Sequence, residues 1–277
     1  GREFAPVMDP ALLGGIVVKG ISIRPMAGNP PPRIVETPCG MLNAIGLANV
    51  GLAVFLSEKL PWLQKLNTRV IANIYGHSLD EYGAVAAGLK GVTGVDALEV
   101  NISCPNVEQG GMAFGTDPSM AARVTERVLK ETDKPVIVKL SPNVTDIRVI
   151  AGAVEEAGAH ALSLINTLTG MTIDIEKARP KLANGSGGLS GPAIRPVALH
   201  MVRQVVKTVH IPVIGMGGIM DAGDALEFLI AGAQAVQVGT ANFTDPKVSL
   251  NILEGIERFL KNRNIDSVRD IIGSLKS

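Results

Sequence analysis

Seven short apolar runs recur along the chain, and each has the length of one β-strand. They are rich in Val and Ile and do not alternate with polar residues, which is typical of strands covered on both faces. The runs are GGIVVKG (14–20), VIANIYG (70–76), ALEVNIS (97–103), VIVKLSP (136–142), ALSLINT (161–167), VIGMGGI (213–219) and AVQVGTA (235–241). Such a series predicts strands of a parallel sheet.

Helical patterns with start and stop signals separate these runs. Ser78 with Glu81 indicates a capping box, and Asp117 followed by Pro118 indicates a cap and a first helical residue. The predicted helices cover 79–90, 118–131, a segment after Thr145 and a segment from Asp221, with Gly158 and Gly232 as helix-ending glycines.

Strands that alternate with helices indicate the α/β class and favour a (β/α)₈ TIM barrel over residues 1–277 as a single domain. Seven strands are visible and a barrel needs eight, while residues 1–13 are too irregular to supply another. We therefore expect the first strand to lie upstream of Gly1. An open doubly wound sheet is the alternative, but no G-x-G-x-x-G turn follows an early strand.

Composition and charge exclude several classes of function. Lys plus Arg and Asp plus Glu number 26 each, so no basic excess points to nucleic acid or to a membrane surface. No apolar run reaches transmembrane length. Cys39 and Cys104 form neither a disulfide framework nor a metal-ligand spacing. We expect a cytoplasmic protein without a bound metal.

Glycine-rich turns follow the last two runs, at 215–219 and 238–241. In βα barrels the loops after the last two strands commonly bind phosphate. Glycine lets backbone N–H groups approach an anion, and a helix from Asp221 would add a favourable dipole. Plain tight turns are the alternative, but both turns fall where the fold would place a phosphate site.

Polar side chains stand in or just after successive runs. They are Lys19, Asn73, Asn101, Ser103, Lys139, Asn166 and Thr167. Each polar group buried without a partner would cost roughly 1–3 kcal/mol. A planar polar ligand with several donors and acceptors would explain these residues together.

Cys104 lies just past a run, between Asn101 and Asn106, at the base of a glycine-rich loop. A free cysteine is often a small hydrophobe, but a thiolate here could also act as nucleophile or base. No cysteine-protease signature surrounds it, and none of the four histidines is an obvious partner. These observations favour proton transfer over acyl transfer.

Several motifs together resemble the dihydroorotate dehydrogenase family, in particular its class 1B catalytic subunits. They are NISCPNV, VIVKLSPNVTDI, SLINTL, GGLSGPAIRPVAL, VIGMGGI, DALEFLIAGA, VQVGTANF and GNPPPRIVETPCGMLNAIGL. The resemblance implies an FMN oxidoreductase of pyrimidine (UMP) biosynthesis that converts (S)-dihydroorotate to orotate. A base would remove the C5 proton, and a hydride would pass from C6 to flavin N5.

The resemblance also implies roles for single residues. Cys104 matches the base, and 105–116 resembles an active-site lid, whereas Cys39 is assigned to packing. The substrate positions are Lys19, Asn43, Ala44, Ile45, Gly46, Leu47, Asn101, Asn166 and Thr167. The FMN positions are Lys19, Gly20, Asn73, Asn101, Lys139, Ile165, Gly191, Gly217, Gly218, Gly239 and Thr240.

The family implies partners as well. Its class 1B catalytic subunits form a homodimer that pairs with an iron–sulfur/FAD subunit, and this heterotetramer passes electrons to NAD. FAD and [2Fe-2S] are therefore expected on the partner subunit only, with one FMN on this chain. Relatives carry further N-terminal residues, including the first strand, so we expect this chain to be N-terminally truncated.

Two other interpretations stay open. A Schiff-base aldolase that uses Lys139 would explain a strand-end lysine in a barrel with a phosphate site. It would not explain Cys104 or the amide side chains at the strand ends. An inactive, truncated barrel is the second alternative.

Overall fold

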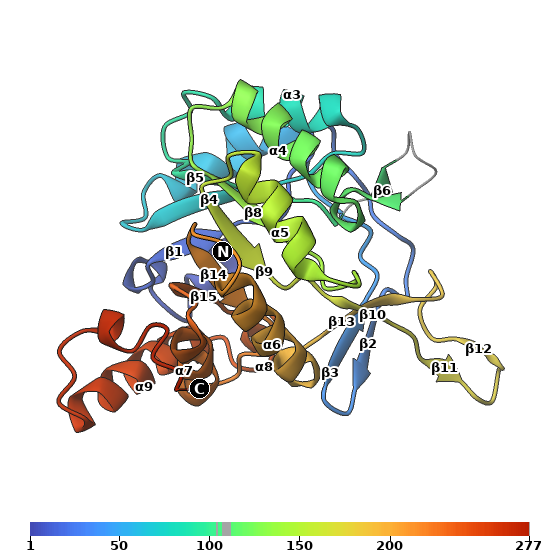
Figure 1. Cartoon of the computed structure of the whole chain (residues 1–277). Coiled ribbons are helices and arrows are strands. Elements are labelled where there is room, and N and C mark those ends of the chain that lie inside the picture. Colours follow the sequence, from blue (N-terminus) through green and yellow to red (C-terminus); the bar gives the residue numbers. More distant parts are fainter. Residues whose placement is uncertain (104, 107–111, 277) are drawn as a thin grey trace.

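The computed structural model describes residues 1–103, 105–106 and 112–276 (Figure 1). Within these residues, seven parallel strands form one curled sheet at the centre of the molecule. In spatial order they are β1 (Gly15–Val17), β4 (Arg69–Ile74), β5 (Ala97–Asn101), β8 (Val136–Lys139), β9 (Ala161–Leu164), β14 (Val213–Met216) and β15 (Ala235–Gln237). The seven predicted strands are confirmed, each inside its apolar run or overlapping it.

The spatial order of the strands is their order along the chain. A doubly wound sheet needs a point where this order reverses, so the alternative of an open doubly wound sheet is wrong. In the described part of the chain β1 and β15 are the two edges of the sheet. Residues 1–13 hold only two short 3₁₀ turns, η1 (Arg2–Phe4) and η2 (Pro10–Leu12), as their irregular sequence predicts.

Helices cover the outer face of the curled sheet (Figure 1). The longer ones are α3 (Leu79–Leu89), α4 (Pro118–Glu131), α5 (Ile147–Glu156), α6 (Arg195–Val206), α7 (Ala222–Ala231) and α9 (Val248–Asn262). The shorter ones are α1 (Gly51–Val54), the π-helical η3 (Phe55–Lys59), α2 (Leu60–Leu63), α8 (Ala241–Thr244), and the 3₁₀ turns η5 (Phe114–Thr116), η6 (Pro192–Ile194) and η7 (Val268–Asp270). Successive helices from α3 to α7 contact one another side by side.

The helix caps and helix-ending glycines predicted from the sequence agree with the structure except in two details. Asp117 accepts a hydrogen bond from the N–H of Met120 at 2.8 Å and caps α4 as expected. Ser78 accepts from the N–H of Glu81, but the carboxylate of Glu81 accepts from the N–H of His77 rather than of Ser78. Asp146, not Thr145, caps α5. Gly158 and Gly232 have positive φ angles at the ends of α5 and α7.

A second, antiparallel sheet was not predicted. Its strands are β10 (Leu168–Gly170), β13 (Gly187–Ser190), β3 (Gly40–Asn43) and β2 (Ile34–Thr37), in that order. They lie in the long connections after β1 and β9. Two smaller hairpins pair β11 (Ile173–Asp174) with β12 (Arg179–Pro180), and β6 (Pro105–Asn106) with β7 (Met112–Ala113).

The assignment of Cys39 to packing is wrong. Cys39 lies in the turn between β2 and β3 and is exposed.

The described residues include no helix that combines the length and the apolar character needed to cross a bilayer.

The packing of the core between the sheet and the helices can be tested by shortening a buried side chain. Leu162 on β9, a strand in the interior of the sheet, is 0% exposed, whereas Leu12 in η2 is 58% exposed. Because a cavity remains where a buried side chain is removed, Leu162→Ala should lower the free energy of unfolding by ~2–5 kcal/mol. Leu12→Ala is the matched control and should change it by less than ~0.5 kcal/mol. Urea unfolding curves of both variants measure this, and equal effects would contradict the packing described here.

Candidate active site

The carboxyl ends of the parallel strands open into a cavity with a volume of about 810 Å³. Because parallel strands all run the same way, the segments that follow them meet at one end of the sheet. The antiparallel sheet adds further lining residues, among them Asn43 of β3 and Gly188 of β13. The cavity therefore combines residues from both sheets.

Every predicted site residue that the structure describes lines this cavity. These residues are Lys19, Gly20, Asn43, Ala44, Ile45, Gly46, Leu47, Asn73, Asn101, Lys139, Ile165, Asn166, Thr167, Gly191, Gly217, Gly218, Gly239 and Thr240. Cys104 lies outside the described residues, as do residues 107–111 of the predicted lid. The roles of all these residues stay predictions.

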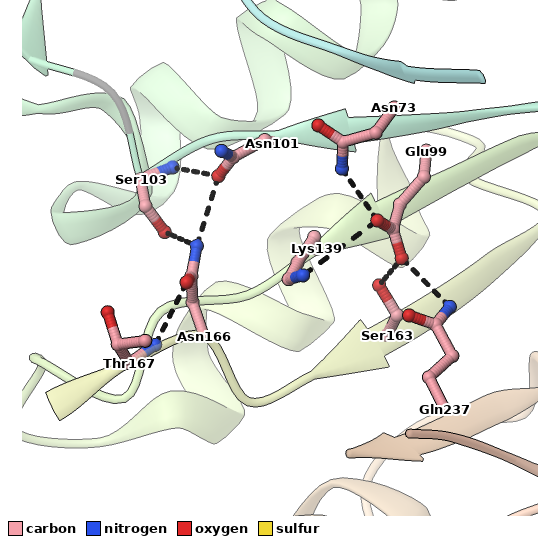
Figure 2. A network of polar contacts seen from close by, with 9 residues as sticks. All are labelled: Asn73, Glu99, Asn101, Ser103, Lys139, Ser163, Asn166, Thr167 and Gln237. Atoms are coloured by element: carbon pink, nitrogen blue, oxygen red, sulfur yellow. Dashed lines mark hydrogen bonds and ion pairs between the residues drawn. The ribbon is translucent and has the colours of Figure 1, made fainter. Parts of the chain in front are cut away.

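Asn101 and Asn166 join the ends of β5 and β9 (Figure 2). The side-chain NH₂ of Asn166 donates to Oδ1 of Asn101 at 3.2 Å and to Oγ of Ser103 at 2.9 Å. The backbone N–H of Ser103 also donates to Oδ1 of Asn101, and that of Thr167 donates to Oδ1 of Asn166. These bonds fix both amide planes, so the NH₂ of Asn101 points away from Asn166.

The segment 43–47 is held from behind by polar side chains. Leu47 has a φ angle of 58°, which is strained for a residue other than glycine. Its carbonyl accepts hydrogen bonds from the hydroxyl of Tyr75 at 2.8 Å and from the NH₂ of Asn49 at 3.0 Å. Gly46 is needed for close approach, because a Cβ there would lie 2.6 Å from the backbone nitrogen of Asn29. The segment is thus a fixed part of the cavity wall.

The glycines after β14 and β15 leave backbone donors available. Within the described part of the chain, no hydrogen bond uses the N–H of Gly217, Gly218 or Gly239. A Cβ on Gly239 would meet no heavy atom within 4 Å, so the cavity is open beside it. Thr240 adds a hydroxyl that donates to Oγ of Ser190 at 2.9 Å. Free N–H groups beside open space are the ordinary means of holding an anion such as phosphate.

The helix from Asp221 differs from the sequence-based expectation. Asp221 accepts a hydrogen bond from the N–H of Asp224, and Asp224 accepts from the N–H of Met220. Arg195 forms an ion pair with Asp224. The start of α7 is therefore occupied by its own carboxylates, which would repel an anion. An anion at this end of the cavity would rely on the glycine N–H groups.

Lys19 gives the cavity a cation near β1. Removal from water lowers the pKa of Lys19, and repulsion by Arg33 and Lys139 lowers it further. In the described part of the chain, no carboxylate lies within ion-pair distance of Lys19. An anionic ligand beside Lys19 would raise the pKa of Lys19 again, because an opposite charge stabilises the ammonium form.

A buried network around Glu99 was missed by the sequence analysis (Figure 2). Glu99 on β5 is 0% exposed. Its partners come from four other strands: Asn73 at 2.6 Å, Ser163 at 2.8 Å, Gln237 at 3.0 Å and, as an ion pair, Lys139 at 3.9 Å. The sequence does hold a signal for Glu99. Residues two apart on a strand share a face, so Glu99 is expected on the same face as Asn101, which was assigned to the cavity.

Metal binding finds no support in the described residues, since no three His, Cys, Asp or Glu side chains gather there in a suitable cluster.

Comparison with known proteins adds a second line of observation. The family model described as dihydroorotate dehydrogenase matches residues 1–260. A protein of Geobacter sp. strain M21 is 60% identical over 276 residues, which are 100% of this chain and 90% of that protein. A protein of Geotalea uraniireducens strain Rf4 is 61% identical over 275 residues, which are 99% of this chain and 90% of that protein.

A protein of Desulforamulus reducens is 57% identical over 274 residues, again 99% of this chain and 90% of that protein. All three carry the name dihydroorotate dehydrogenase B (NAD(+)), catalytic subunit. The same motifs that line the cavity at the strand ends thus fall within a match that runs along almost the whole chain. The chain belongs to the dihydroorotate dehydrogenase family.

Proposed function

We propose that this chain is the catalytic subunit of an NAD-linked dihydroorotate dehydrogenase, which oxidises dihydroorotate to orotate in cytoplasmic pyrimidine biosynthesis. The observation that carries the proposal is family membership combined with one cavity that gathers lysines, amides and glycine N–H groups from separate strands. A flat, polar substrate beside a flat, polar cofactor matches such a lining.

The cavity residues fit FMN. The N–H groups of Gly217, Gly218 and Gly239 would hold the phosphate, while Lys139 and Asn73 would meet the ring. When bound, FMN supplies the acceptor, at its N5 atom, for the hydride that leaves C6 of the substrate. Other FMN positions in the proposal are Lys19, Gly20, Asn101, Ile165, Gly191 and Thr240.

The substrate would be held by Lys19, by the fixed segment 43–47 and by the joined amides of Asn101 and Asn166. Lys19 is suited to a carboxylate, and the amides are suited to the ring carbonyls and N–H groups. Rigid binding of this kind lowers the barrier because little ordering is left for the reaction itself. Sγ of Cys104 would take the proton from C5, as the family resemblance implies.

The electron acceptor would be reached through a second protein. The chain has two cysteines, 65 positions apart, whereas an iron–sulfur site made of cysteines alone uses four. We therefore propose a homodimer of this chain paired with a subunit that carries FAD and [2Fe-2S]. We also propose that in the full-length protein an eighth strand pairs with β1 and β15 and completes the (β/α)₈ barrel, because open sheet edges expose unpaired backbone groups.

An aldolase based on Lys139 has less support. The ammonium of Lys139 forms an ion pair with the buried carboxylate of Glu99, whereas a Schiff base requires a free amine. Trapping of a carbonyl substrate on Lys139 by borohydride would overturn this view.

Replacement of Cys104 tests the proposed base. In the protein reconstituted with FMN, dihydroorotate should bleach the visible flavin band. Cys104→Ser should slow bleaching roughly 10²–10⁴-fold near neutral pH, because a hydroxyl is a far weaker base than a thiolate. Cys39→Ser is the matched control, since Cys39 is exposed and outside the cavity. Equal rates in both variants would remove Cys104 from the mechanism, and a protein that never binds FMN would contradict the proposed function.

The lowered pKa of Lys19 predicts a pH dependence of orotate binding. The ammonium form attracts the orotate carboxylate, so affinity should fall as the pH rises through the pKa of Lys19. Because this pKa is lowered, the fall should begin below about pH 10.4, the value for an ordinary lysine. Lys19→Arg should keep orotate affinity constant over the same range, whereas Lys207→Gln, on an exposed residue, should behave like the original chain. Titrations at several pH values measure this, and identical curves for Lys19→Arg and the original chain would exclude Lys19.

Turnover with NAD tests the need for a partner. The full-length protein, loaded with FMN, should reduce a dye with dihydroorotate but should not reduce NAD at a comparable rate. Absorbance of NADH measures this directly. Rapid reduction of NAD by the purified chain alone would refute the proposed partner subunit.

A further inference from the structure

Glu99 presents an unusual combination of position and chemistry. Its carboxylate is fully buried, yet it belongs to the lining of the cavity. Among the described residues that line the cavity it is the one carboxylate, beside the two cations Lys19 and Lys139. A buried carboxylate costs several kcal/mol unless it is paired and hydrogen-bonded. A well-packed apolar residue would often serve stability as well, so the carboxylate calls for a role other than stability.

The two oxygens of Glu99 hold different partners (Figure 2). Oε2 accepts from the NH₂ of Asn73 at 2.6 Å and lies 3.9 Å from Nζ of Lys139. Oε1 accepts from the hydroxyl of Ser163 at 2.8 Å and from the NH₂ of Gln237 at 3.0 Å. One side chain on β5 thereby links β4, β8, β9 and β15 across the sheet.

These bonds decide which atoms of two amides face the cavity. The NH₂ of Asn73 is engaged by Glu99, so its Oδ1 is turned toward Gly20, where a Cβ would lie only 3.0 Å from it. The NH₂ of Gln237 is engaged in the same way, so its Oε1 is turned away from Glu99. A neutral glutamine in place of Glu99 would keep one acceptor oxygen but would turn an NH₂ toward the donors on its other side, and the side chains there would have to turn.

The charge of Glu99 acts on the same ligand. With Glu99 ionised, the two lysines and the carboxylate give the cavity lining a net charge of +1, and without it the net charge is +2. Removing the carboxylate would leave the charge of Lys139 uncompensated. Any bound group that gains negative charge on reduction would then be stabilised more strongly.

We propose that Glu99 is a positioning residue for the flavin, which orients the amides of Asn73 and Gln237, holds Lys139, and moderates the positive charge that the flavin ring meets. This inference rests on the proposed binding of FMN. Glu99 acts through its partners and is not itself assigned a contact with substrate.

The test compares variants of the full-length protein loaded with FMN. Glu99→Gln removes the charge and replaces one of the two acceptor oxygens by a donor. It should weaken FMN binding about tenfold, the effect of losing about one good hydrogen bond. It should also raise the two-electron reduction potential of the bound flavin. Fluorescence titration measures the affinity, and equilibrium titration against a reference dye measures the potential.

Two further variants separate positioning from mere stability. Ser163→Ala removes a bond to Glu99 from a residue outside the cavity lining, so it should lower stability without moving the potential. Glu99→Asp keeps the charge but shortens the reach, so the potential should stay near that of the original chain while FMN binding weakens. It also serves if Glu99→Gln does not fold.

The outcomes are distinct. An unchanged potential and FMN affinity in Glu99→Gln, with FMN bound by the original chain, would overturn this inference alone. Equal shifts of potential in Ser163→Ala and Glu99→Gln would do the same, because a structural effect would then suffice. Absence of FMN from the full-length protein without substitutions would overturn the proposed function and this inference with it.

Discussion

The parallel pairing of each strand with the next strand of the chain is the constraint on which the site depends. Backbone hydrogen bonds between β1, β4, β5, β8, β9, β14 and β15 keep all strand directions the same. Residues as distant in sequence as Lys19 and Thr240 therefore line one cavity. Helices cover the apolar side chains on the outer face of the sheet. The carboxyl ends of the strands remain available for polar chemistry.

Many polar groups in the cavity wall and directly behind it hydrogen-bond to one another. Asn166 is bonded to Asn101, Asn49 to Leu47, and Glu99 to side chains on four other strands. Such bonds offset the cost of burial and also fix the direction of each donor and acceptor. Preorganisation of this kind means that a ligand need not order the site, which is a general source of affinity and of rate.

Much of the parallel sheet could be predicted because its strands carry a local signal. Runs of Val and Ile mark them, and caps such as Asp117 mark the helices between them. The antiparallel sheet carries no such signal, since GGLS of β13 and LTG of β10 are short and rich in small residues. Their partners are also distant: Gly188 pairs with Asn43, which is 145 positions away. Only the tertiary structure brings these segments together.

The site residues were predicted unevenly, and the reason is physical. Asn101 is the last residue of β5, and Lys19 and Asn166 come shortly after strands, where fold rules assign function. Glu99 lies deeper in β5, where an isolated charge in an apolar run contradicts simple patterning. Burial of its carboxylate depends on hydrogen bonds from Asn73, Ser163 and Gln237. These residues come from three other strands and cannot be recognised as its partners from the sequence. Glu99 is therefore both the site residue that is hardest to explain from its local sequence and the one whose position depends most on the whole sheet. This is expected where a side chain serves a site rather than packing.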